Sequence, residues 1–383
     1  MMNTIDLDLN FNLSSLTYDL ITYFSIVILL FILEKKKRIS QIDLFFLIIF
    51  CSTPLFFNNI IFHWGEFPDQ KKYVDKAYEL RNYFTSSLNS PTNSNVFYSS
   101  LVYSIAPVLS FNSINSIAFV NKILIVSLFV FFKKKNVNKF FLYSLILYPS
   151  IIIYSSLSLR EVLIIFFMLI SGYYFFQKNY FIFLISTIML FLIKEQYAFF
   201  LTISLIFYRY FIQSGQRPLK FIAFFFISLV CYFLFRNQLF EIVENYRDGF
   251  IKEIGGYQEA LNGPSYYDSS YLNTDLNYVF KLIFAYLKTF IYPFLSGISL
   301  IKTIFFLDNI LYSGLFFLNC LILFKHNKKN VCFWLVNYLI VNSIISYISI
   351  NDMTLLRYKF PWVIFYIFCL SYTCRNKQLS KSS

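Results

Sequence analysis

Long apolar stretches, separated by short polar connections, recur along nearly the whole chain. About eleven of them approach the roughly 20 predominantly apolar residues that a helix needs to cross a bilayer. The chain has 383 residues, of which 58% are hydrophobic and only 14% are charged. A soluble protein could not bury that much apolar surface. The pattern predicts an all-α fold: a polytopic membrane helical bundle with about 11 transmembrane helices, forming a single integral membrane domain over residues 1–383.

Basic residues gather in the short connections, and their distribution predicts the orientation of the chain. Lys35–Arg38 follow the first apolar stretch, and Lys133–Lys135 follow the third crossing. Cytoplasmic loops are enriched in Lys and Arg, so both groups are predicted to be cytoplasmic. The acidic N-terminus is then outside and the tail is inside. The net charge of +13 is explained by these loops, and no basic stretch has the length or the interleaved aromatic residues of a nucleic-acid site.

The predicted spans leave two sizeable extracytoplasmic loops, at about 63–114 and about 237–300. Keeping the basic groups on one side requires residues 97–111, which contain Pro107, to form a short juxtamembrane helix. The same argument makes residues 281–296 a partial helix. The spans are placed at about 17–33, 42–62, 115–132, 139–156, 160–176, 180–194, 197–212, 219–236, 301–324, 331–350 and 361–375.

Neither the six cysteines nor the two histidines have a spacing that indicates a metal site. The cysteines lie in or at the end of apolar segments, which is typical of buried free thiols. We predict no metal site and no cofactor. A divalent metal is an open alternative that no motif indicates.

Charged residues outside the basic clusters lie mainly at the outer ends of the predicted spans. Asp69 follows Pro68 and begins a segment in which Tyr73, Ala77 and Leu80 share one helical face. A carboxylate at a helix N-terminus is held in its ionised form by the helix dipole. A plain helix cap on a solvated loop is the alternative interpretation of Asp69.

Three further charged groups flank spans: Arg160–Glu161, Lys194, and Arg357–Lys359. Charges beside the hydrocarbon layer are costly unless they are paired or face a polar cavity. Local ion pairs or interfacial anchors would also explain them. Together these groups could hold a pyrophosphate and accept a proton from a sugar hydroxyl at one outer surface. The candidate residues are Glu66, Asp69, Arg160, Glu161, Lys194, Arg357, Tyr358 and Lys359.

Short motifs spread over most of the chain carry a resemblance to a known family. In chain order they are Glu66 and Asp69 with Tyr73 and Ala77, a short helix before Asn121, Ser158–Glu161 after Pro149, Tyr292–Phe294 before Asp308, and Arg357–Pro361. Their order resembles that of bacterial polysaccharide polymerases of the Wzy/EpsG type, which are similar in layout to GT-C glycosyltransferases.

The resemblance implies an enzyme of O-antigen, capsule or exopolysaccharide synthesis in the bacterial cytoplasmic (inner) membrane. Such an enzyme transfers a growing glycan from undecaprenyl diphosphate onto the next lipid-linked repeat unit at the outer face. By resemblance, Asp69 is the candidate base, with Glu66 beside it, and Arg160 and Arg357 hold the diphosphate. Glu161, Lys194, Tyr358 and Lys359 would complete the substrate-binding set. The expected partners are the undecaprenyl-diphosphate-linked glycan, membrane lipid and a chain-length regulator.

Three other functions remain open. A single-sugar GT-C glycosyltransferase, using a polyprenyl-phosphate sugar donor, would use the same surface. An O-antigen ligase usually carries a His in its late outer loop, and residues 237–280 contain none. A lipid-linked oligosaccharide flippase or other transporter would place ionisable groups at the middle of its spans. Here most charges lie at the outer ends, with Asp308 as the main exception.

Overall fold

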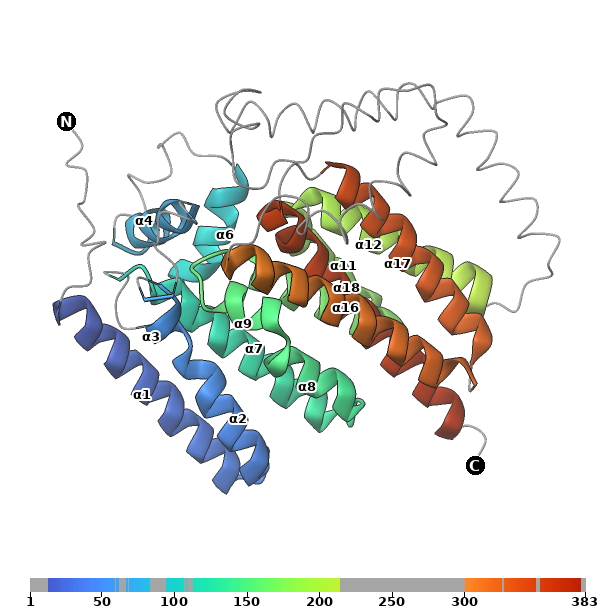
Figure 1. The fold of residues 1–383 in the computed structure, drawn as a ribbon, viewed down its shortest axis with the longest axis horizontal. Helices are drawn as coiled ribbons and strands as arrows, with labels where there is room; N and C mark the ends of the chain where they lie inside the picture. The colour runs from blue at the N-terminus through green and yellow to red at the C-terminus, as the bar shows by residue number, and fades with distance from the viewer. Residues whose placement is uncertain are drawn as a thin grey trace. The chain divides into compact units, whose positions relative to one another are not determined.

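The computed structural model describes residues 13–58, 60–61, 67, 69–82, 94–106, 108, 113–213, 300–325, 327–348 and 352–379. Every regular element in these ranges is helical, which confirms the predicted all-α fold (Figure 1). The predicted span at 219–236, outer loop 2 and the partial helix at 281–296 lie outside the described residues. The chain divides into two compact units, Met1–Leu201 (unit 1) and Thr202–Ser383 (unit 2).

In its described residues, unit 1 contains ten helices and the first part of α12. They are α1 (Leu13–Lys35), α2 (Gln41–Ser52), α3 (Pro54–Phe57), α4 (Asp69–Asn82), α6 (Ser94–Ser104), α7 (Ser116–Lys134), α8 (Lys139–Leu147), α9 (Pro149–Ser155), α10 (Glu161–Phe176), α11 (Tyr180–Ile193) and α12 (Glu195–Tyr208). Helices α7 and α10 are largely buried and form the centre of the unit, whereas α1 lies beside α2 with most of its surface exposed.

Two described helical segments, Leu16–Lys35 and Ser116–Lys134, are long and apolar enough to cross a membrane. Three shorter apolar segments of 10–17 residues accompany them, at Gln41–Phe57, Glu161–Phe176 and Tyr180–Ile193. The two long segments differ in their surroundings. In Leu16–Lys35 17% of the apolar window is buried inside the protein, and in Ser116–Lys134 67% of it is buried. Length and composition alone therefore identify two membrane-length helices among the described residues.

Proline interrupts three of the predicted helices. The span predicted at 42–62 is two helices, with a break at Thr53 before Pro54, and it ends at Phe57. The span predicted at 139–156 is broken at Tyr148, before Pro149. The juxtamembrane helix predicted at 97–111 is α6, which ends before Pro107. Proline has no amide hydrogen to continue a helix, so the helices are interrupted at these points; Tyr148 before Pro149 is extended, whereas Thr53 before Pro54 keeps helical backbone angles.

One end of unit 1 is rich in lysine, and we call it the lysine end. Ser40 caps α2 in a capping box with Asp43, and the Asp43 carboxylate forms an ion pair with Lys133 near the end of α7. Tyr173, near the end of α10, packs its ring 5.1 Å from that of Phe131. The ends of α7 and α10 and the start of α2 therefore meet, together with the basic groups Lys35–Arg38, Lys133–Lys135 and Lys178.

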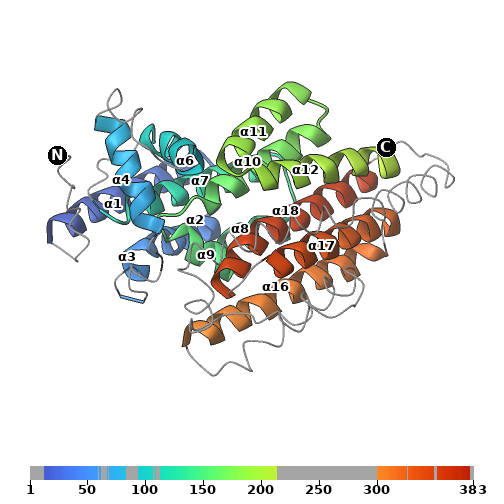
Figure 2. The same ribbon diagram turned by 90° about the horizontal axis from the view of Figure 1, so that it is seen from above.

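Unit 2 contains the remainder of α12, a short π-helix at Arg209–Gln213, and α16 (Leu300–Phe324), α17 (Lys328–Ile348) and α18 (Asp352–Leu379). Figure 2 shows α16, α17 and α18 side by side, and stacked aromatic rings fill their interface. The rings of Phe316 on α16 and Tyr338 on α17 stack at 4.0 Å, and the ring of Tyr366 on α18 lies 6.3 Å from the first and 6.0 Å from the second.

The last helix begins earlier than the sequence predicts. A span was expected at 361–375, but α18 starts at Asp352 and continues through Pro361. A proline inside a helix removes one backbone hydrogen bond and costs helix stability. Residues 360–370 are all buried, so packing against α16 and α17 holds the helix continuous through the proline.

The Asp43–Lys133 pair should contribute measurably to the stability of unit 1. Asp43 is 5% and Lys133 31% exposed, so Asp43→Asn leaves a half-buried ammonium without its counter-charge. We expect the free energy of unfolding in detergent to fall by about 1–3 kcal/mol. Lys134→Ala, at an exposed neighbouring lysine, is the matched control. Equal unfolding curves for the two variants would contradict the pairing of α2 with α7.

Candidate functional site

A chain of buried polar side chains crosses unit 1 at the end opposite the lysine end. The Asp19 carboxylate accepts hydrogen bonds from Ser113 Oγ at 2.9 Å and from Asn115 Nδ2 at 2.8 Å. Asn115 Oδ1 accepts from Asn58 Nδ2 at 2.8 Å, and Asn58 exchanges two 3.1 Å bonds with Gln70. We call this set the amide network, and the end of the unit that holds it the network end.

The amide network attaches α4 to the rest of unit 1. Gln70, in the first turn of α4, also accepts a 2.8 Å hydrogen bond from the backbone N–H of Ser158. Tyr73, Ala77 and Leu80 are buried, which confirms the helical face predicted from their spacing. Ser100 Oγ on α6 donates to the carbonyl of Tyr73 at 3.2 Å. Helix α4 is therefore fixed against the rest of the unit by buried hydrogen bonds, which specify one position for it.

Residues 156–160 connect α9 to α10 as a loop without regular structure, and side chains of α7 satisfy its backbone. The Ser158 hydroxyl donates to the Ile114 carbonyl and accepts from the Ala118 N–H at 3.2 Å, so it bridges the first turn of α7. Asn121 Nδ2 donates to the carbonyls of Leu157 at 3.0 Å and Leu159 at 2.9 Å. The loop is almost wholly buried, so its backbone groups cannot bond to water. The hydrogen bonds from side chains satisfy them instead.

Arg160 ends this loop at the N-cap position of α10. Its side chain is only 9% exposed, and Nη1 donates a long 3.4 Å hydrogen bond to the carbonyl of Ile193. The guanidinium carbon lies 5.8 Å from the centre of the Tyr73 ring, a cation–π distance. Nε has no hydrogen-bond acceptor, and no described carboxylate forms an ion pair with this guanidinium. Arg160 is therefore a buried cation with unused donor capacity.

Tyr103 of α6 and Glu161 of α10 complete the surroundings of Arg160. The Tyr103 hydroxyl lies 2.8 Å from the Leu159 carbonyl oxygen and 2.9 Å from Asn121 Oδ1, and it can donate to either. Burial raises the pKa of Tyr103 well above its usual value; Glu161 and Tyr73 raise it further, and Arg160 opposes them. We call Tyr73, Tyr103, Arg160 and Glu161 the Arg160 cluster.

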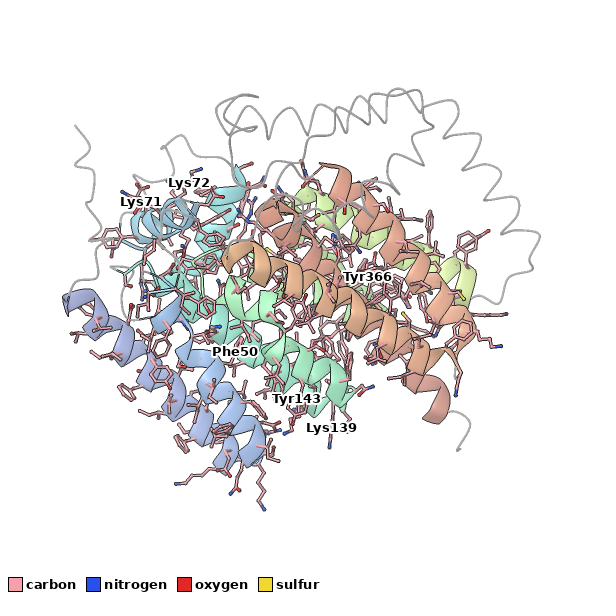
Figure 3. The ribbon with its side chains drawn as sticks, in the orientation of Figure 1. Phe50, Lys71, Lys72, Lys139, Tyr143 and Tyr366 are labelled. Carbon is pink, nitrogen blue, oxygen red and sulfur yellow. The ribbon has the colours of Figure 1, made fainter. Side chains whose placement is uncertain are left out.

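Lys122 is a further buried basic residue, which was not among the predicted site residues. Its side chain is fully buried, Nζ lies 2.7 Å from Ser155 Oγ, and the ammonium sits 3.8 Å from the centre of the Phe50 ring. Phe50 is labelled on α2 in Figure 3. An ionisable residue inside a predicted apolar span is a functional signal in itself, and it would have singled out Lys122.

The structure brings several predicted site residues to the network end. Asp69 is the first residue of α4, where its carboxylate pairs with Lys72 at 3.0 Å and remains 37% exposed. Lys194 follows Ile193, whose carbonyl accepts from Arg160. Figure 3 shows Lys71 and Lys72 on α4 at this end and Lys139 at the lysine end of the same unit. Glu66 lies outside the described residues.

The remaining predicted residues, Arg357, Tyr358 and Lys359, belong to α18 of unit 2. Lys359 is 3% exposed, and the carboxylate of Asp308 on α16, itself 1% exposed, acts on it electrostatically. Arg357 and Tyr358 are half-buried. Within unit 2, Lys359 therefore faces the interior of the helical layer.

Comparisons with known proteins add no constraint, because the chain matches no protein-family model, no curated protein and no solved structure. Among the residues that the structure describes, no group of three His, Cys, Asp or Glu side chains is placed to hold a metal ion. Cys51, Cys320 and Cys369 are buried free thiols, but Cys332 is exposed, so the expectation of burial was wrong there.

Asp75 on α4 should make stability depend on pH. Burial raises the pKa of this half-buried carboxyl from 3.8 to about 6, while Lys71 lowers it and Glu79 raises it. The folded state thus binds the proton more tightly, and this contribution is complete below about pH 4 and lost as the pH rises through about 6. Asp75→Asn should flatten the fall in melting temperature between about pH 4 and 7. Parallel melting profiles for variant and wild type would contradict this.

Proposed function

We propose that this chain is an integral membrane glycosyltransferase that joins undecaprenyl-diphosphate-linked repeat units into a polysaccharide. In this proposal it acts at the outer face of the bacterial cytoplasmic membrane, as polysaccharide polymerases of the Wzy/EpsG type do. The observation that carries the proposal is Arg160, a buried guanidinium with unused donor capacity at the start of α10.

The electrostatics of this position favour an anionic ligand. A buried guanidinium without a paired carboxylate costs several kcal/mol of desolvation. The N-terminus of α10 adds positive potential from the helix dipole, so Arg160 stands where a cation is least favoured. Glu161 lies in the first turn of α10, at the same helix end. A diphosphate would satisfy both the guanidinium and the helix N-terminus, since such ends bind phosphate groups readily.

Exposed apolar surface supports a membrane location. Soluble monomers rarely expose large contiguous apolar areas unless something covers them. Along α1, Phe24 and Ile28 are 57% and 61% exposed, and on α11 Phe181 is 74% exposed. Similar residues line the outer faces of α2, α16 and α17. The proposal covers these faces with lipid, in an arrangement of about eleven spans with the lysine end cytoplasmic and the N-terminus outside.

In the proposed reaction, a hydroxyl of the acceptor repeat unit attacks the anomeric carbon of the donor glycan. The new glycosidic bond forms as the bond from that carbon to the diphosphate oxygen breaks. The diphosphate leaves with the electron pair, and Arg160 stabilises the charge that develops on it. The hydroxyl proton passes to a carboxylate, for which Asp69 is the candidate and Glu66 the neighbouring alternative.

The other predicted residues take supporting roles in this proposal. Lys194 directly follows the carbonyl that Arg160 contacts, which suits it to a second phosphate contact. Glu161 adjusts the charge of the Arg160 cluster. Arg357, Tyr358 and Lys359 are proposed substrate-binding residues of unit 2. Membrane lipid and a chain-length regulator are the proposed partners.

A lipid-linked oligosaccharide flippase is the second candidate function, and two buried ionisable residues favour it. Lys122 and Asp308 are 0% and 1% exposed within apolar helices, where transporters place their coupling groups. Purified protein in vesicles distinguishes the two functions. Elongation of a lipid-linked repeat unit without net translocation supports the polymerase, and translocation without elongation supports the flippase.

Replacing Arg160 should abolish polymer formation. Arg160→Ala removes the charge proposed to hold the diphosphate, and we expect a loss of roughly 100-fold or more in the transfer rate. Glycan length on gels, from cells in which the variant replaces the wild-type gene, is the measurement. Lys134→Ala, at an exposed lysine of the lysine end, should leave glycan length unchanged. Full-length glycan with Arg160→Ala would refute the proposed role.

Asp69→Asn tests the assignment of the base separately. The change keeps the size of the side chain and removes its ability to accept a proton at neutral pH, so polymer should be lost while the protein still inserts. Lys72→Gln breaks the same exposed ion pair and should cost little, because surface pairs contribute about 0–1 kcal/mol. Normal polymer in the Asn variant would transfer the base role to another carboxylate.

A further inference from the structure

Two adjacent residues of α7 hold the two ends of the loop that carries Arg160. Asn121 donates to the carbonyls of Leu157 and Leu159, on the side of the loop that leads to Arg160. Lys122 contacts Ser155 and Ile152 at the other end, where α9 stops and the loop begins. A single turn of one helix therefore defines the course of loop 156–160.

Three groups surround the amine of Lys122. Nζ lies 2.7 Å from Ser155 Oγ, 3.5 Å from the Ile152 carbonyl oxygen and 3.8 Å from the centre of the Phe50 ring. The Ile152 carbonyl belongs to the last turn of α9, where the helix dipole favours a cation. The face of an aromatic ring adds a cation–π contact, which is worth more when it is desolvated.

Folding alone does not require a charge at this position. Lys122 is fully buried and forms no ion pair with any described carboxylate, so its desolvation is offset only by these three contacts. Apolar side chains of similar volume often replace buried charged groups with no loss of stability. A methionine would fill much the same space but would remove the amine from Ser155 Oγ, while the Ser156 N–H would still donate to the Ile152 carbonyl.

We propose that Lys122 is a positioning residue for the anion site at Arg160. It fixes the last turn of α9 and hence the start of loop 156–160, while Asn121 fixes the rest of that loop. The guanidinium of Arg160 is thereby held in place before the anion binds. This inference rests on the proposed function, since it needs a phosphate-bearing ligand at Arg160.

Preorganisation is the physical reason why such a residue would matter. A binding group must be held to within about 0.5 Å of its productive position by a supporting shell of packed and hydrogen-bonded residues. Loop 156–160 lies outside the regular helices and depends on contacts with α7, α4 and α6. Loss of the Lys122 contacts therefore loosens the segment that ends at Arg160, even where the helices stay folded.

The test measures ligand binding and stability on the same full-length variants in detergent micelles. Farnesyl diphosphate is the probe, with farnesyl monophosphate as the comparison. Lys122→Met should bind the diphosphate about 10-fold more weakly, with a melting temperature close to that of wild type. Lys122→Arg keeps the charge and should restore binding to within about threefold. Ser171→Ala is the matched control, since Ser171 is a buried serine of α10 that bonds Ser186, away from the loop.

The results separate this inference from the proposed function. If wild-type protein fails to bind farnesyl diphosphate, the proposed function fails and this inference with it. If wild type binds and Lys122→Met binds equally well, only the role of Lys122 is refuted. Should Lys122→Met not fold, Ser155→Ala replaces it, because that change removes one contact of the ammonium and keeps the charge. Binding by Ser155→Ala equal to that of Ser171→Ala would then refute the role.

Discussion

Buried backbone groups must find partners inside the protein, and in unit 1 this requirement determines the shape of the candidate site. Loop 156–160 is nearly all inaccessible to solvent, yet it has no helix of its own to satisfy its amides and carbonyls. The Ser158 hydroxyl forms hydrogen bonds with the backbone at the first turn of α7, and Asn121 Nδ2 donates to two carbonyls of the loop. The position of Arg160, at the end of this loop, is a consequence of those bonds.

The two ends of unit 1 differ in chemistry as well as in position. At the lysine end, charges are exposed or paired across helices, as Lys133 is with Asp43. At the network end, buried amide side chains link α1, α3, α4 and α7, beside the exposed pair of Asp69 and Lys72. Arg160 stands out at that end because it is a buried guanidinium whose Nε has no hydrogen-bond acceptor.

Hydropathy predicted the central helices well, because a span of apolar residues is a local property. The spans expected at 115–132, 160–176 and 180–194 correspond to α7, α10 and α11 to within two residues. Hydropathy does not show where a helix is interrupted, so the helix breaks before Pro54 and Pro149 were not predicted. Arg160 and Asp69 were found as isolated charges, but the amide network was not. Its members lie up to 96 residues apart, and the local sequence around an asparagine gives no sign of a distant partner.

The first helix, α1, is held in place partly by residues that come much later in the chain. Only 17% of its apolar window is buried, and its contacts within the unit are chiefly with α2 and α7. The Asp19 carboxylate, near its start, is satisfied by Ser113 and Asn115. During synthesis on the ribosome, α1 emerges long before those two residues exist. Its final seating therefore cannot be completed until the start of α7 has been translated, which makes α1 an early-formed but late-docked element.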